Sequence, residues 1–217
     1  MDWIRRRGLY AIVDPAHCAG RDPRAVAGAI LQGGCAVLQL RAKALADAPW
    51  LALARALRAM CAGAGVPFVL NDRPDLAVLA GADGLHLGRG DLPVCEARRI
   101  VGAGMAVGLS THDEAQAREA VGLGADLIGF GPIFETTSKH RPDPVVGLDR
   151  LAAVSRECPL PVVAIGGIAA DRAADVAASG ASLVAAISAV CGADDPAAAA
   201  RAFHGAVGGA NPPVRPT

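Results

Sequence analysis

Two aspartates, Asp72 and Asp91, each follow a short apolar run, and basic side chains close other runs at Arg41, Lys43 and Lys139. A pair of carboxylates that can reach one ion, with room left for water and phosphate oxygens, suits Mg²⁺ better than zinc. Cations beside such a pair would neutralise the charge of an anion bound through the metal. These residue types therefore predict a site that binds a pyrophosphate through Mg²⁺.

Each of these residues also has a simpler interpretation. Asp72 and Asp91 both stand two residues before a proline that could begin a helix, so either could be an N-cap. Arg41 and Lys43 could be solvated charges, although Gln39 on the same face favours a site. Lys139 could be an exposed loop lysine, but we expect it to head an active-site lid that continues from 140 to 146.

The elements that must position these residues are indicated by a recurring unit of glycine, one or two small residues and a short apolar run. Glycine just past a helix end followed by an apolar run is typical of a buried strand that begins after a helix. Between the units lie helix patterns, such as the apolar spacing from Trp50 to Met60. Thr111 and Glu114 predict a capping box, and Glu114 and Arg118 an ion pair within one helix. The unit occurs at 33–38, 63–70, 81–87, 102–107, 124–129 and 180–184.

The alternation of strands and helices predicts the fold class. Eight strands that are apolar on both faces, each followed by a helix, indicate a single-domain (β/α)8 barrel over residues 1–207, with 208–217 as a disordered tail. An open doubly wound sheet is the alternative, but it usually has a glycine-rich turn after its first strand, where this chain has Asp14-Pro15-Ala16-His17. The strands are expected at 9–13, 37–41, 67–70, 84–87, 106–110, 127–130, 161–165 and 183–187.

Such a barrel would gather the polar residues at one mouth, the carboxyl ends of its strands. A period of two places Gln39, Arg41 and Lys43 on one side of their strand, and the ~4.8 Å spacing of strands would let Asp72 and Asp91 reach one ion. Gly167 and the 187–188 peptide would offer backbone N–H groups after the last two strands, the usual phosphate site of a barrel. Two anion sites imply two substrates, or one with phosphate at both ends.

Composition excludes several function classes. Lys and Arg number 21 and Asp and Glu also 21 among 217 residues, so no net charge recruits nucleic acid or an anionic membrane. No apolar run approaches the ~18 residues of a membrane span, and the basic start lacks the apolar stretch of a signal peptide. The six cysteines are scattered without metal-binding spacing and are interpreted as small buried hydrophobes. We therefore expect a cytoplasmic protein that acts on small molecules.

Other polar and aromatic residues carry weaker predictions. Ser110 and His112 could suggest a nucleophilic dyad, but their spacing and the lack of an evident buried acid argue against it. His86, between two leucines, is expected to be a hydrogen-bonded interior residue. Phe130 and Phe134 are the candidates for an aromatic face against a ligand ring.

The chain resembles the thiamine-phosphate synthase family. Seven segments match in the family's order and cover the chain from about Gly8 to Val190. The segments are QLRAK (39–43), NDRPD (71–75), GADGLHLGRGD (81–91), GLSTH (108–112), GADLIGFGPIFETTSK (124–139), PVVAIGGI (161–168) and AAISAV (185–190).

The resemblance implies an enzyme that joins hydroxymethylpyrimidine pyrophosphate to hydroxyethylthiazole phosphate by dissociative substitution, giving thiamine phosphate and pyrophosphate. It implies one Mg²⁺ per active site, held by Asp72 and Asp91, and catalytic roles for Arg41, Lys43, Ser110 and Lys139. The implied pyrimidine pyrophosphate ligands are Gln39, Arg41, Lys43, Asn71, Ser110 and Lys139, and the implied thiazole phosphate ligands are Thr136, Ser138, Gly167, Ile187 and Ser188. Leu40, Ala42 and Thr137 are also implied to bind substrate.

Two alternatives remain open at the sequence level. The loop at 135–139 departs from the family's common pattern, and its Phe134-Glu135-Thr136 also resembles the related thiazole tautomerase, which forms no C–N bond. In that relative a histidine follows the strand-six glycine and the second metal carboxylate tends to be missing, whereas this chain has Pro132 and Asp91. A non-catalytic binding homologue is the other alternative, although Asp72, Asp91 and Lys139 are all present.

Overall fold

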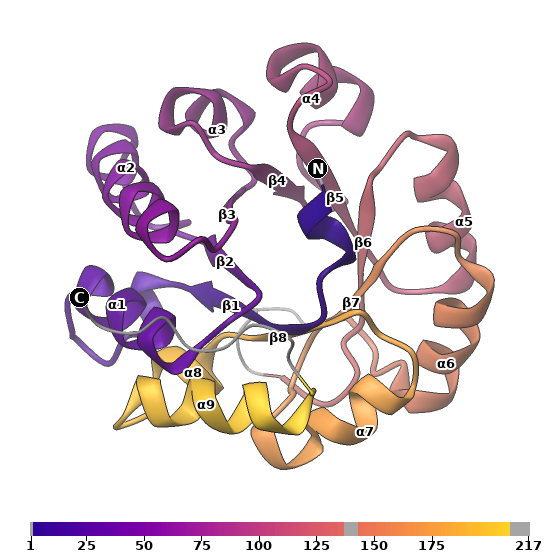
Figure 1. The fold of residues 1–217 in the computed structure, drawn as a ribbon. Helices are drawn as coiled ribbons and strands as arrows, with labels where there is room; N and C mark the ends of the chain where they lie inside the picture. The colour runs from indigo at the N-terminus through magenta and orange to yellow at the C-terminus, as the bar shows by residue number, and fades with distance from the viewer. Residues whose placement is uncertain (1, 137–142, 209–217) are drawn as a thin grey trace.

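The computed structural model describes residues 2–136 and 143–208, and shows a closed barrel of parallel strands in sequential order (Figure 1). Helices surround the barrel, so the expected (β/α)8 class is confirmed and the open doubly wound sheet is wrong. The strands lie within one or two residues of their predicted bounds. They are β1 (Gly8–Val13), β2 (Val37–Leu40), β3 (Phe68–Asn71), β4 (Gly84–Leu87), β5 (Ala106–Thr111), β6 (Leu127–Phe130), β7 (Val162–Ala164) and β8 (Leu183–Ala186).

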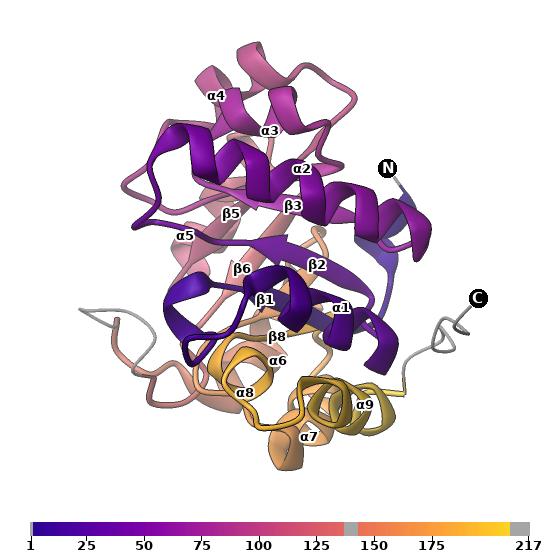
Figure 2. The same ribbon diagram turned by 90° about the vertical axis from the view of Figure 1, so that its left-hand side faces the viewer.

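The helices form an outer ring around these strands (Figures 1 and 2). The longer ones are α1 (Pro23–Gly33), α2 (Asp47–Gly63), α3 (Pro74–Ala80), α4 (Val94–Val101), α5 (Glu114–Gly122), α6 (Gly147–Glu157) and α9 (Pro196–Ala206). The shorter ones are η1 (Asp2–Arg5), η2 (Pro15–His17), η3 (Ala170–Arg172), α7 (Ala173–Ala178) and α8 (Ser188–Cys191).

The core has two parts, because each barrel strand buries both of its faces. One apolar cluster lies between the strands and the helix ring, and a second fills the barrel interior around residues such as Tyr10, Val69 and Leu183. The six cysteines are free thiols. As expected, Cys18, Cys35, Cys61 and Cys191 are buried, whereas Cys95 is exposed and Cys158 half-buried.

The amino end of the barrel is tied together by a repeated contact that the Gly-Ala-Asp repeats encode. Asp83 accepts the backbone N–H of Phe68 at 2.8 Å and pairs with Arg58 at 3.3 Å. Asp126 makes the same contacts two strands further along, between β5 and β6. It accepts the N–H of Val107 at 2.8 Å and pairs with Arg98 at 2.5 Å. Each aspartate thus joins two neighbouring strands and a helix, and we call this contact the aspartate clasp.

The same end of the barrel is closed by the N-terminal turn η1, which lies across it in Figure 1. Trp3 packs against the interior cluster, and its ring occupies the space that a Cβ at Gly84 would need, with a closest approach of 2.8 Å. Gly84 begins β4, so Trp3 fills the floor of the barrel, opposite the carboxyl ends of the strands.

Close packing also joins the first and last long helices. A Cβ at Gly33 in α1 would lie 2.3 Å from the carbonyl oxygen of Ala197, so only glycine lets α9 approach so closely (Figure 2). This contact brings the C-terminal helix beside the N-terminal one and completes the ring. The predicted tail lies, beyond Gly208, outside the described residues. In the part of the chain that is described, no helix is long and apolar enough to cross a membrane.

Two local predictions were wrong. The cap of α5 is Asp113, whose side chain accepts the N–H of Gln116 at 2.8 Å, while Thr111 belongs to β5 and donates to the carbonyl of Gly129. The main partner of Glu114 is Arg150 of α6 at 2.6 Å, so this ion pair joins two helices instead of two turns of one.

Candidate active site

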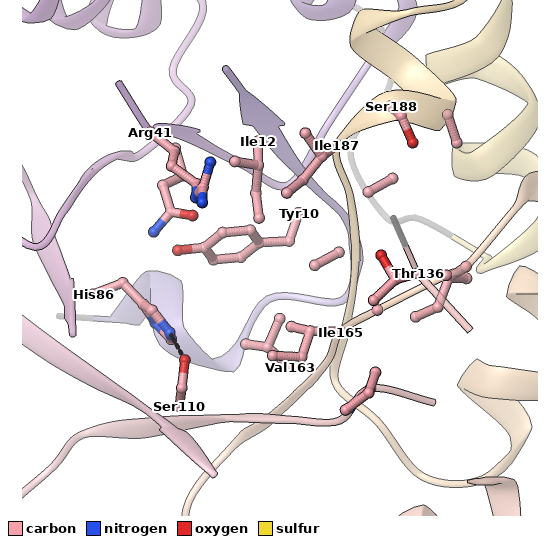
Figure 3. A pocket seen from close by; sticks show the side chains of 18 of the residues that line it. Tyr10, Ile12, Arg41, His86, Ser110, Thr136, Val163, Ile165, Ile187 and Ser188 are labelled. Carbon is pink, nitrogen blue, oxygen red and sulfur yellow. Dashed lines mark hydrogen bonds between the residues drawn. The ribbon is translucent and has the colours of Figure 1, made fainter. Parts of the chain in front are cut away.

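A cavity of about 390 Å³ opens at the carboxyl ends of the strands (Figure 3). It is lined by inward-facing side chains of the barrel and by the loops after β6, β7 and β8. Eight of the sixteen residues predicted to form the site line it. They are Gln39, Arg41, Asn71, Ser110, Thr136, Gly167, Ile187 and Ser188.

The two predicted metal ligands lie beside this cavity and contact each other. The carboxyl groups of Asp72 and Asp91 are hydrogen-bonded, and Lys43 approaches Asp72 at 3.0 Å. Burial, followed by the hydrogen bond with Asp91, raises the pKa of Asp72 to about 6, and Lys43 acts in the opposite direction. Two carboxyl groups this close need a proton or a cation between them at neutral pH, so the pair fits a divalent cation.

Neither aspartate is a helix cap, which removes the simpler interpretation. The residues at the cap positions of α3 and α4 are Arg73 and Pro93, without a side-chain cap. Asp72 itself has a positive φ of 65°, a backbone conformation that costs energy for a residue with a side chain. Asp91 folds back to accept the N–H of Gly88 at 2.7 Å. Both carboxylates are therefore held in place by the ends of neighbouring strands.

Within the described residues, no third His, Cys, Asp or Glu joins this pair. Two carboxylates leave most of the coordination sphere of a cation open to water and to ligand oxygens. That is how Mg²⁺ usually binds at sites for phosphorylated substrates. Asp72 and Asp91 thus fit a metal that is bound partly by the substrate itself.

Amide and guanidinium groups adjoin the carboxylate pair. Gln39 on β2 donates to the side-chain oxygen of Asn71 on β3 at 3.4 Å, and both side chains are buried. Arg41 lines the cavity and pairs with the buried carboxylate of Asp14. The strand alternation used in the prediction therefore places Gln39 and Arg41 correctly. Leu40 and Ala42 instead face the outer core, so only their backbone could reach a ligand.

His86 and Ser110 form a polar contact inside the barrel, 3.0 Å apart (Figure 3). The imidazole lies over two glycines: a Cβ at Gly108 would meet Nδ1 at 2.6 Å, and one at Gly129 would meet Cε1 at 3.1 Å. As predicted, His86 is a hydrogen-bonded interior residue, and it also orients the hydroxyl of Ser110. The rejected Ser110–His112 dyad is absent: His112 bonds to the carbonyl of Gly131 at 2.5 Å and to Asp143 at 3.2 Å.

The loop after β6 packs directly onto the turn after β7. Gly166 and Gly167 have positive φ, and a Cβ at Gly167 would lie 2.2 Å from the carbonyl oxygen of Glu135. Only glycine permits this approach, so Gly166 and Gly167 also allow the loop after β6 to pack against the turn after β7. With this packing, Thr136 lines the same cavity as Ile187 and Ser188, the residues predicted to hold a phosphate.

Three predicted ligands, Thr137, Ser138 and Lys139, lie outside the described residues, as does the first part of the expected lid, up to residue 142. The aromatic prediction was wrong. Phe130 is buried in the outer core, and Phe134 stacks under the guanidinium of Arg172 at 4.7 Å.

The aromatic residue of the cavity is Tyr10, whose ring lies among its lining side chains in Figure 3. Among the described residues its buried hydroxyl has no hydrogen-bond partner, and burial raises its pKa. The strand alternation that leads from Tyr10 through Ile12 could have identified it as inward-facing.

Comparison with known proteins identifies the family to which the chain is similar. The family model "Thiamine monophosphate synthase" matches residues 9–190. Thiamine-phosphate synthase of Anaeromyxobacter dehalogenans is 50% identical over 204 residues, which cover 93% of this chain and 88% of that protein. The corresponding protein of Chloroflexus aurantiacus is 42% identical, with 95% and 94% covered.

A solved structure has the same fold. Thiamine phosphate pyrophosphorylase from Pyrococcus furiosus superposes with a TM-score of 0.86 at 31% identity, covering 95% of this chain and 97% of that one. The family match extends from β1 to α8 and includes every strand that contributes to the cavity. The chain therefore belongs to the thiamine monophosphate synthase family, a family of transferases in thiamine biosynthesis.

Proposed function

We propose that this protein joins hydroxymethylpyrimidine pyrophosphate to hydroxyethylthiazole phosphate, releasing pyrophosphate and forming thiamine phosphate. The observation that carries the proposal is the contact between Asp72 and Asp91, at the rim of a cavity with one cationic and one glycine-rich end. Its six free thiols fit a reducing compartment, and we place the enzyme in the cytoplasm.

The pyrimidine pyrophosphate would occupy the end formed by β2, β3 and β5. Arg41 and Lys43 supply positive charge there, and Gln39, Asn71 and Ser110 supply hydrogen-bonding groups. The buried Gln39–Asn71 contact gives the site a polar floor of fixed orientation. A fixed polar group discriminates between heterocycles by hydrogen-bond pattern, because a mismatched ring leaves it unsatisfied.

The thiazole phosphate would occupy the opposite end. Gly166 and Gly167 expose backbone near Ser188, and Ile165, Ile168 and Ile187 provide an apolar wall for a neutral ring. This division places the two reacting substrates in one cavity. Their proximity replaces a bimolecular encounter by a positioned one.

In the proposed reaction the bond between the pyrimidine methylene carbon and the pyrophosphate oxygen breaks first, and the electron pair leaves with pyrophosphate. The ring nitrogen of the thiazole then donates its lone pair to the methylene cation. No proton is lost from that nitrogen, so the site needs no general base. Arg41 and Lys43 would stabilise the departing charge, and Lys139 is proposed to do the same.

Mg²⁺ bound by Asp72 and Asp91 would neutralise part of the charge on the leaving pyrophosphate. His86 keeps the hydroxyl of Ser110 in one orientation, which lets Ser110 position the pyrimidine ring without a rotamer search. The chain's residues thus bind, orient and balance charge, and the chemistry resides in the substrates.

The direct test mixes the purified protein with both substrates in Mg²⁺ and then in excess chelator, and measures thiamine phosphate by its oxidation to fluorescent thiochrome. We expect product with Mg²⁺ and its loss with chelator. Absence of product under both conditions would contradict the proposal.

The tautomerase alternative is tested in the same preparation. Pro132 lines the cavity where that relative carries its proton-transferring histidine, so we expect no isomerisation of the thiazole carboxylate phosphate. Isomerisation without Mg²⁺ and without the pyrimidine substrate would replace the proposed function by the tautomerase.

A further inference from the structure

Asp14 is a buried carboxylate at the mouth of the barrel, outside every segment that carries the family resemblance. It follows β1 directly, and only 2% of its surface is exposed. A buried charge is costly unless it is paired, so its partner indicates its role. That partner is the guanidinium of Arg41.

Strand register explains why these two residues meet. In the ladder between β1 and β2, Ile12 lies opposite Gln39, and the N–H of Arg41 continues the ladder by donating to Val13 at 2.9 Å. Two residues beyond Ile12 and Gln39, the same inward faces present Asp14 and Arg41. The pair is therefore set by the backbone and does not depend on a flexible loop.

The carboxylate of Asp14 is held on more than one side. One carboxylate oxygen of Asp14 accepts the N–H of Ala16 at 3.0 Å, and the other bonds to Nη1 of Arg41. His17 also lies 3.6 Å from that second oxygen. Arg41 is largely buried and lines the cavity, so its remaining N–H groups are available to an anion there.

We propose that Asp14 is a positioning residue for the leaving pyrophosphate: it fixes the guanidinium of Arg41 in the orientation that receives the phosphate oxygens. This inference rests on the proposed function. An arginine that is already ordered loses less side-chain entropy on binding and can meet the developing charge without reorganisation. Asp14 acts through Arg41 and touches no substrate itself.

The decisive variant is Asp14→Asn, which can keep an oxygen for the N–H of Ala16 but replaces the oxygen that accepts from Arg41. We expect the Kd of pyrophosphate, measured by calorimetry in Mg²⁺, to rise about tenfold. The Kd of thiazole phosphate should change less than twofold. Asp14→Ser, which keeps a capping hydroxyl, gives the same readout if the asparagine variant folds poorly.

A double-mutant cycle separates positioning from simple structural support. If Asp14 acts through Arg41, the double variant Asp14→Asn with Arg41→Gln binds pyrophosphate no more weakly than Arg41→Gln alone. If the increases in the Kd of pyrophosphate for the two single variants multiply in the double variant, the proposal is overturned. So would an unchanged or tighter Kd in Asp14→Asn, since tighter binding means that the carboxylate mainly repels the anion.

The matched control is Asp126→Asn, which removes the charge from another arginine-paired aspartate at the opposite end of the barrel. We expect it to lower the melting temperature without changing the Kd of pyrophosphate. A wild-type protein that binds no pyrophosphate would overturn both this inference and the proposed function. A wild-type protein that makes thiamine phosphate, with Asp14→Asn binding pyrophosphate normally, would overturn the inference alone.

Discussion

Asp91 is the residue whose charge the proposed chemistry most needs. Its carboxylate would share the proposed cation with Asp72, and it accepts a hydrogen bond from the N–H of Gly88. Asp91→Asn keeps an oxygen for that N–H but removes the charge. We expect turnover to fall ~10²–10³-fold, the usual loss when a preorganised electrostatic contact is removed. The measurement is the initial rate of thiamine phosphate formation at saturating Mg²⁺.

Asp75→Asn is the matched control for this prediction. Asp75 also follows β3, but its carboxylate is exposed and pairs with Arg73 at 2.7 Å, away from the cavity. Its removal should leave turnover within twofold. Near-normal turnover in Asp91→Asn would remove Asp91 from the metal site.

Gly108 carries a second residue-scale prediction, because its missing side chain makes room for His86. In Gly108→Ala the new methyl group would meet the imidazole at 2.6 Å and push it away from Ser110. Overpacking of this kind costs ~1–3 kcal/mol of stability. We also expect kcat/KM for the pyrimidine substrate to fall about tenfold, measured in steady-state assays.

The comparison for that variant is Gly104→Ala, where a Cβ would meet nothing within 4 Å. It should behave as wild type in both stability and activity. Wild-type kcat/KM in Gly108→Ala would mean that the orientation of Ser110 by His86 does not matter for the reaction.

Arg41 and Asp72 were predicted from the sequence, whereas Tyr10 and the buried Asp14 were not. Arg41 and Asp72 are conspicuous because a charge at the end of an apolar run needs an explanation. Tyr10 is not, because an aromatic residue within a strand is ordinary. Its place in the cavity depends on which face of β1 turns inward, and the same information was needed to pair Asp14 with Arg41.

The helix pair α5 and α6 is joined by the Glu114–Arg150 ion pair, which gives a pH prediction at the scale of elements. Hydrogen bonds from Arg150 lower the pKa of Glu114 from 4.5 to about 2. A lowered pKa in the folded state means that this stabilisation is present above about pH 4.5 and is lost as pH falls towards 2.

We expect Glu114→Gln to lower the free energy of unfolding by no more than ~1 kcal/mol at pH 7, since the pair is partly exposed. Urea unfolding at several pH values between 3 and 7 should show this difference shrinking with acidity. Glu157→Gln, whose carboxylate pairs only with its neighbour Arg156 among the described contacts, should show no such trend. A difference as large at pH 3 as at pH 7 would contradict the assignment.

The strands and their ends were predicted closely, but the cap of α5 and the ion-pair partner of Glu114 were not. The glycine-led repeats located six of the eight strands, since each glycine follows a helix and each apolar run is buried on both faces, and the apolar runs alone indicated β1 and β7. The cap of α5 was displaced by two residues because Thr111 and Asp113 are both good capping types. Which of the two residues caps α5 depends on where β5 ends. The ion-pair partner of Glu114 depends on how α5 packs against α6.

On the scale of the whole molecule, stability and chemistry occupy opposite ends of the barrel. Trp3 fills the floor, and the cavity opens at the other end. We expect Trp3→Ala to lower the free energy of unfolding by ~2 kcal/mol, less than for a fully buried tryptophan, with kcat unchanged. Chemical denaturation and steady-state rates check the two parts.

Leu79→Ala provides the comparison for Trp3→Ala. Leu79 is a large apolar residue that is 55% exposed on α3, so its truncation should cost less than ~0.5 kcal/mol. A fall in kcat for Trp3→Ala in folded protein would show that the floor also shapes the cavity.

The aspartate clasps carry a consequence for engineering. Asp83 and Asp126 fix strand register at the amino end of the barrel, through backbone contacts that involve no residue of the cavity. Segments at the mouth can then be exchanged for those of other barrels without retuning how the strands align. The chain therefore offers a scaffold for loop grafting, in which new specificity could be introduced above a foundation that stays the same.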